Sequence, residues 1–132
     1  MGLKTHFLIL LEDSAWSVTK MTRQGIERSE PAPLDPKNIR ASSGAIRDRL
    51  AALGYRGQPL LLALGSSWCV NVAMEIPTAR KGRKREDLAY QLEWYLPWAA
   101  EEIVADYEIH GSKAFAVAAH AEPLALLLSE LQ

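Results

Sequence analysis

The chain has 132 residues, of which 48% are hydrophobic, and its 15 basic and 16 acidic side chains give a net charge of −1. This length predicts one soluble domain with a core and is too short for two domains of ordinary size. The near-zero charge excludes a protein that binds nucleic acid through bulk positive charge. The longest apolar runs, 7–11 and 60–64, are too short to span a bilayer.

The beginning of the chain carries no export signal. Residues 1–6 lack an apolar stretch followed by a small-residue cleavage site, which predicts a cytoplasmic protein. The single cysteine, Cys69, excludes an internal disulfide and a zinc site made of cysteine pairs. Because Cys69 lies on the polar face of an alternating segment, we expect a small packing residue rather than a nucleophile.

The first three predicted elements are strands. Residues 4–12 have a continuous apolar centre, typical of a central strand that is covered on both faces. Residues 16–21 alternate between apolar and polar side chains and predict the second strand of a hairpin. A weak third strand around 26–28 ends at Pro31 and Pro33, which we expect to prevent pairing in a sheet.

A helix and two further strands follow. Asp35-Pro36 is a typical helix start, and Gly54 is a typical helix end. Residues 60–64 predict a second fully apolar strand. Residues 68–76 alternate and predict a half-covered strand that ends at Pro77.

The last part of the sequence predicts a helix at 86–97, two short strands at 104–109 and 114–119, and a third helix that begins at Glu122-Pro123. The third helix stops at Gln132 without a stop signal, so we expect the chain to be truncated there. The element order is β-β-β-α-β-β-α-β-β-α, which indicates an α/β chain. We divide it into a first subdomain at 1–75 and a small subdomain at 76–132.

The histidines, which are the commonest metal ligands, are not spaced along the chain as metal-binding pairs are. The three histidines have none of the spacings that place two ligands together, so we expect no metal site. The alternative is a nucleotide-binding enzyme or nuclease of RNase H-like strand order, in which Glu12, Glu75 and Asp106 would hold Mg²⁺. Strand alternation explains the same carboxylates as solvent-facing residues.

Five of the six residues in 80–85 are basic: Arg80, Lys81, Arg83, Lys84 and Arg85. Such a cluster gains about 1 kcal/mol of binding free energy per charge at an anionic membrane surface. One hypothesis is therefore contact with anionic lipid, an acidic partner or nucleic acid. A solvated loop is an equal alternative, because like charges at this density repel one another.

Aromatic side chains gather in residues 90–98, at Tyr90, Trp94, Tyr95 and Trp98. Aromatic side chains with a polar tip are enriched at protein interfaces, because they bury a large area and can still satisfy that tip. Core packing accounts for part of this group. The predicted helix nevertheless has more apolar surface than one core face needs, so we expect a partner-binding surface here.

Four short motifs follow one another along the chain: Leu11–Val18 (LEDSAWSV), Leu62–Trp68 (LALGSSW), Met74–Pro77 (MEIP) and Tyr95–Tyr107 (YLPWAAEEIVADY). In this order they resemble the actin-like cytoplasmic proteins of type IV pilus and type II secretion machines, the PilM and GspL family. The last motif is the most distinctive. The resemblance covers nearly the whole chain.

The resemblance implies the N-terminal half of an actin-like, RNase H-like protein, with β-β-β-α-β followed by a small β-α-β-β-α lobe. It also implies a non-catalytic scaffold in the cytoplasm, peripheral to the inner membrane. Such a scaffold would bind a membrane partner's tail or the assembly ATPase. Protein partners in an inner-membrane platform are therefore expected, with an anionic membrane surface as a further candidate and nucleic acid disfavoured.

One departure from the family pattern bears on catalysis. Nucleotide-binding members carry an Asp-x-Gly turn that holds phosphate against backbone donors, whereas this chain has Glu12, Asp13 and Ser14 there. The second half of the family's ATP site is also absent from these residues. We therefore interpret 12–14 as a degenerate phosphate turn and expect no cofactor, with ATP and Mg²⁺ only if further chain restores the site.

Overall fold

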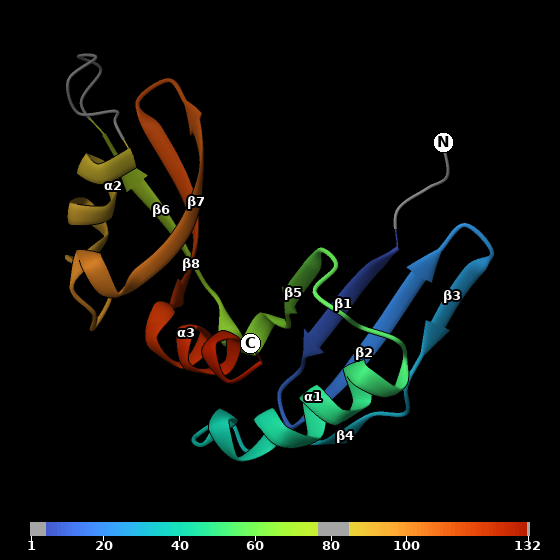
Figure 1. Ribbon diagram of the computed structural model, residues 1–132. Helices are drawn as coiled ribbons and strands as arrows, with labels where there is room; N and C mark the ends of the chain where they lie inside the picture. The colour runs from blue at the N-terminus through green and yellow to red at the C-terminus, as the bar shows by residue number, and fades with distance from the viewer. Residues whose placement is uncertain (1–4, 77–84, 132) are drawn as a thin grey trace. The chain divides into compact units, whose positions relative to one another are not determined.

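The computed structural model describes residues 5–76 and 85–131, and the chain divides into two compact units (Figure 1). The first unit comprises Met1–Trp68 with Ala125–Gln132, and the second comprises Cys69–Leu124. No helix among the described residues is long and apolar enough to cross a membrane.

The first unit is built on a five-stranded sheet, together with helical segments from 39–68 and from the last part of the chain. The strand order is β3-β2-β1-β5, and β4 pairs with β2 beside β3. The bounds of the strands are β1 His6–Leu11, β2 Ala15–Thr22, β3 Gly25–Arg28, β4 Ala32–Pro33 and β5 Leu60–Leu64. The helical segments from 39–68 are η1 Ile39–Ser42, α1 Ser43–Ala52 and η2 Ser66–Trp68.

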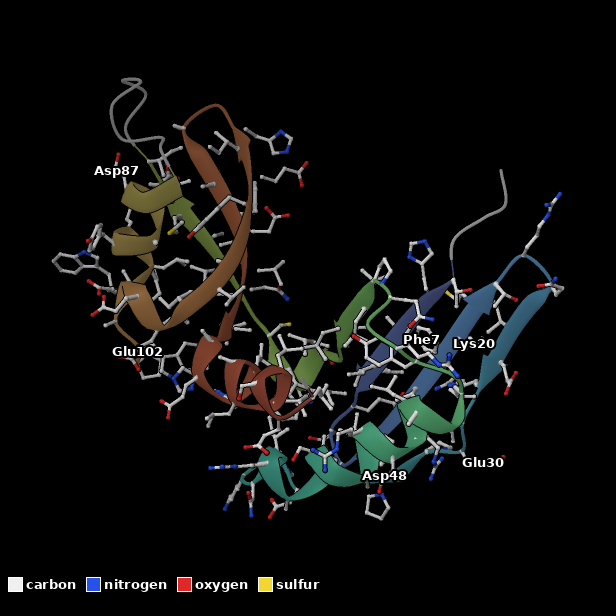
Figure 2. All side chains as sticks on the ribbon, in the orientation of Figure 1. Phe7, Lys20, Glu30, Asp48, Asp87 and Glu102 are labelled. Carbon is white, nitrogen blue, oxygen red and sulfur yellow. The ribbon has the colours of Figure 1, made fainter. Side chains whose placement is uncertain are left out.

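Strand β1 is the central strand, antiparallel to β2 and parallel to β5. Phe7, which Figure 2 labels, is fully buried together with Ile9 and Leu11, whereas Leu8 and Leu10 are partly exposed. The ring of Tyr55, just after α1, contacts the ring of Phe7 edge-on at a centroid distance of 5.1 Å. The described residues therefore bury one face of β1 completely, where the apolar run had predicted full cover on both faces.

The proline-rich segment after β3 differs from the prediction. We expected the two prolines to prevent pairing, but Pro33 lies opposite Ala15 in a two-residue strand at the edge of the sheet. The backbone N–H of Leu34 extends this contact by donating to the carbonyl of Ser14 at 2.9 Å. The prediction is wrong because the nitrogen of a proline carries no hydrogen, and on an edge strand it needs no hydrogen-bond partner.

The helix predicted from Asp35-Pro36 begins later. The carboxylate of Asp35 accepts a hydrogen bond from the N–H of Lys37 at 2.9 Å and closes a local turn, and the 3₁₀ helix η1 then leads into α1. The predicted end is confirmed, because Gly54 has a φ of +95° that favours glycine.

The second unit contains a three-stranded antiparallel sheet in the order β6-β8-β7, with α2 on one side of it (Figure 1). The bounds are β6 Val70–Glu75, α2 Arg85–Leu92, η4 Ala100–Glu102, β7 Ile103–His110 and β8 Lys113–His120. Helix α2 ends at Leu92, earlier than the predicted 97, and turns follow it. The core between α2 and the sheet contains Met74, Ile76, Leu88, Leu92, Leu96, Ala114, Ala116 and Ala118.

The boundary between the units lies earlier than the predicted division into 1–75 and 76–132. Strand β6 belongs to the second unit because all six of its residues pair with β8. The last helix, α3 (Ala121–Glu130), returns the chain to the first unit. There the carboxylate of Glu130 lies 2.9 Å from the Arg40 guanidinium, and Leu127 is fully buried.

The burial of β1 predicts that two leucines of the same sheet contribute unequally to the free energy of unfolding. Leu11 is fully buried, whereas Leu61 on β5 is 53% exposed. Leu11→Ala should lower the free energy of unfolding by about 2–5 kcal/mol, because it leaves a cavity. Leu61→Ala should lower it by less than about 1 kcal/mol. Urea denaturation measures both, and equal losses would contradict the assignment of the core face.

Candidate functional site

Three exposed aromatic side chains of the second unit lie close together in the sequence, and we call them the aromatic surface: Tyr90, Trp94 and Tyr95. Their exposed fractions are 62%, 87% and 54%. Large aromatic side chains are normally well buried, so an 87% exposed tryptophan is unusual. The three residues lie within six positions of one another, on α2 and the turns that follow it.

The exposure of these rings follows from the packing of α2. Leu88, Leu92 and Leu96 recur every four residues and are all buried against the sheet. Tyr90 and Trp94 have the same spacing but lie two positions out of phase with the leucines. They therefore belong to another side of the helical segment. The leucines anchor this segment to the sheet, so the exposed aromatic rings are not required for the core.

Trp98 differs from the other three predicted binding residues. It is partly buried, and its ring stacks on the imidazole of His120 with a centroid distance of 4.9 Å and an interplanar angle of 3°. The Nε2 atom of His120 is shielded from solvent and has no hydrogen-bond partner among the described residues. A carboxylate oxygen of Glu102 lies 3.5 Å from it. Trp98 therefore packs within the second unit.

The distinctive motif at 95–107 has a structural role that sequence reasoning missed. The backbone N–H of Ala99 donates to the carboxylate of Glu102 at 3.3 Å, and the N–H of Ala100 donates to the carboxylate of Glu93. These contacts satisfy free donors at the start of η4. Glu102, labelled in Figure 2, immediately precedes β7 and so helps the chain to turn from α2 into the sheet.

The turn at 12–14 follows β1 in the first unit, and its backbone contacts other parts of that unit. The N–H of Glu12 donates to the carbonyl of Ala15 at 2.8 Å. The indole N–H of Trp68 donates to the carbonyl of Glu12 at 2.7 Å. Glu12, Asp13 and Ser14 are all exposed. Trp68 was predicted to begin a strand, but it ends the 3₁₀ helix η2 and contacts this turn.

The remaining predicted site residues fall in different parts of the chain. The basic segment at 80–84 lies outside the described residues, and of Arg85 the structure describes only the backbone at the start of α2. Glu12 belongs to the first unit, whereas Glu75 and Asp106 belong to the second. Within 5–76 and 85–131, no group of three or more His, Cys, Asp or Glu side chains could hold a metal ion.

Gly65 lies close to the backbone of the turn at 12–14, and this contact predicts how an alanine there changes stability. A Cβ on Gly65 would lie 3.1 Å from the Leu11 carbonyl oxygen and 3.3 Å from the Glu12 Cα, which are both backbone atoms. Gly65→Ala should therefore lower the free energy of unfolding by about 1 kcal/mol or more. Gly44→Ala on α1 meets open space and should raise it by about 0.5 kcal/mol.

Thermal unfolding of the two alanine variants checks this prediction. A Gly65→Ala protein as stable as the Gly44→Ala protein would show that the two turns do not approach each other this closely.

Two of the solved structures that match this chain belong to secretion and pilus proteins. The cytoplasmic domain of EpsL, an inner membrane component of the type II secretion system of Vibrio cholerae, matches 97% of this chain and 52% of that chain, with a TM-score of 0.67 and 16% identity. A chain of the PilM-PilN type IV pilus biogenesis complex matches 96% of this chain and 43% of that chain, with a TM-score of 0.65 and 16% identity.

A third match is a Bacteroides thetaiotaomicron protein with an actin-like ATPase fold and unknown function, at a TM-score of 0.59, 12% identity, and coverage of 96% of this chain and 48% of that chain. No protein-family model matches the sequence, and no curated protein sequence matches it either. The chain spans about half the length of the matched structures. The predicted α/β class and actin-like fold are thereby confirmed for the part of the fold that the chain covers.

Proposed function

We propose that this chain is a non-catalytic, protein-binding component of a type II secretion or type IV pilus assembly. In this proposal it acts as a scaffold on the cytoplasmic side of the inner membrane and binds a partner's tail or the assembly ATPase. Two fold matches support the proposal, because one is a domain of an inner membrane secretion component and the other comes from a pilus biogenesis complex.

The observation that carries the proposal is the aromatic surface. Exposed apolar side chains that gather on one face of a protein typically mark a site where another molecule binds. Tryptophan and tyrosine are also the residues that contribute most often to the energetic centre of protein interfaces. Trp94 is exposed enough for nearly its whole ring to be available to a partner.

The turn at 12–14 supports a non-catalytic role. Each of its three residues has a side chain, where a glycine would let a phosphate approach the backbone. One carbonyl of the turn already accepts the indole N–H of Trp68.

Calorimetry tests the proposal. The membrane partner's cytoplasmic tail and the assembly ATPase's cytoplasmic domain are each titrated into the chain. Trp94→Ala should weaken binding of the recognised partner at least about tenfold, because an anchoring tryptophan contributes about 2 kcal/mol or more. The same change should alter the free energy of unfolding by no more than about 0.5 kcal/mol, since the ring is exposed.

Ile26→Ala provides the matched control, because Ile26 is 74% exposed but lies on β3 of the first unit. It should leave partner affinity unchanged. Equal affinity of the Trp94→Ala protein and the unaltered chain would contradict the role of the aromatic surface. Heat on titration of Mg-ATP, with no partner bound, would favour the nucleotide-binding alternative.

A further inference from the structure

The sheet of the second unit has a second face that carries apolar side chains. Helix α2 lies on the face with Ala114, Ala116 and Ala118 (Figure 1). Alternation along β8 directs Phe115 and Val117 to the opposite face, where they are 45% and 50% exposed. Asn71, Ala73, Asp106 and Glu108 are also exposed on this opposite face, which we call the outer face.

The outer face is hollowed and carries negative charge. A shallow hollow of about 470 Å³ is lined from this face by Asn71, Ala73, Asp106, Glu108, Phe115 and Val117. Both charged side chains among these lining residues are acidic. The outer face therefore combines apolar surface with carboxylates.

The apolar and acidic residues form two parallel rows. The strand register places Glu108 opposite Phe115, and Asp106 opposite Val117. One row thus runs along β8 and is apolar, while the neighbouring row on β7 is acidic; within this second row the imidazole of His110 lies 2.8 Å from the Glu108 carboxylate. Val104, which is 55% exposed, lies on β7 two positions before Asp106 and extends the apolar surface.

The dimensions of the outer face match one helix. Three strands are separated by two spacings of about 4.8 Å, which gives a width of about 10 Å, close to the diameter of an α-helix. The eight residues of β8 extend over about 26 Å, the length of about 17 helical residues.

We propose that the outer face binds an amphipathic helix of a partner protein, in which an apolar stripe is flanked on one side by lysine or arginine. The stripe covers Phe115 and Val117, and the basic side chains face Asp106 and Glu108. A second copy of this chain is a poorer occupant, because it offers the same acidic row and, on this face, only Lys113 as a fixed positive charge.

This surface is distinct from the aromatic surface and its existence does not depend on the proposed function. The aromatic surface belongs to α2 and its following turns, whereas the outer face belongs to the side of the sheet that α2 does not cover. One lobe would therefore have two binding surfaces of different chemistry.

The test uses a synthetic 17-residue helical peptide with a leucine stripe flanked by lysines, titrated into the whole chain by fluorescence anisotropy. Val117→Lys should weaken binding at least tenfold, because it places a charge in the apolar row. Glu108→Lys should weaken it at least threefold, and this loss should shrink in 1 M salt. Circular dichroism confirms that both variants, which change exposed side chains, are folded.

Two matched controls locate the binding site. Glu101→Lys reverses an exposed carboxylate in η4, outside the outer face, and should leave the affinity unchanged. Trp94→Ala should also leave it unchanged. Binding that is insensitive to Val117→Lys, or that Trp94→Ala weakens equally, would overturn the proposal. So would a dimer in analytical ultracentrifugation that Val117→Lys dissociates, since the occupant would then be a second copy.

Discussion

The position of β1 between β2 and β5 is the constraint on which the first unit depends. Six residues of β1 pair with β2, and five pair in parallel with β5, although β5 lies about fifty residues further along the chain. Parallel pairing requires the crossover that α1 supplies. It also places the end of β5 against the turn after β1, where the N–H of Gly65 donates to the Leu11 carbonyl at 2.7 Å.

The second unit has a small core, and this core determines what its surfaces can do. Three leucines of one helical segment cover one face of a three-stranded sheet. The face toward α2 is lined mainly by alanines on β8, so α2 can lie close to it. Phe115 and Val117 on β8 alternate to the outer face, and the rings of Tyr90 and Trp94, which are out of phase with the leucines, reach solvent. Both candidate binding surfaces thus follow from the same two periodicities.

Much of the fold was predictable because local patterns determine it. Alternation in β6, apolar runs in β1 and β5, and the glycine after α1 each identify an element without tertiary information. The edge strand at Ala32–Pro33 was not predictable, since only the position of β2 makes a proline acceptable there. The exposure of Trp94 was partly predictable from its phase relative to Leu92. The stacking of Trp98 on His120 joins residues 22 positions apart, and no local pattern signals it.

We infer that this chain works by binding a protein through its second unit. Hydrogen-exchange mass spectrometry of the whole chain, alone and saturated with the partner's cytoplasmic tail, tests it most directly. Binding of the tail should slow exchange in residues 87–98. It should leave exchange in β1 unchanged, because the amides of β1 are already held by two neighbouring strands. Protection confined to the turn at 12–14, or no protection within the second unit, would contradict it.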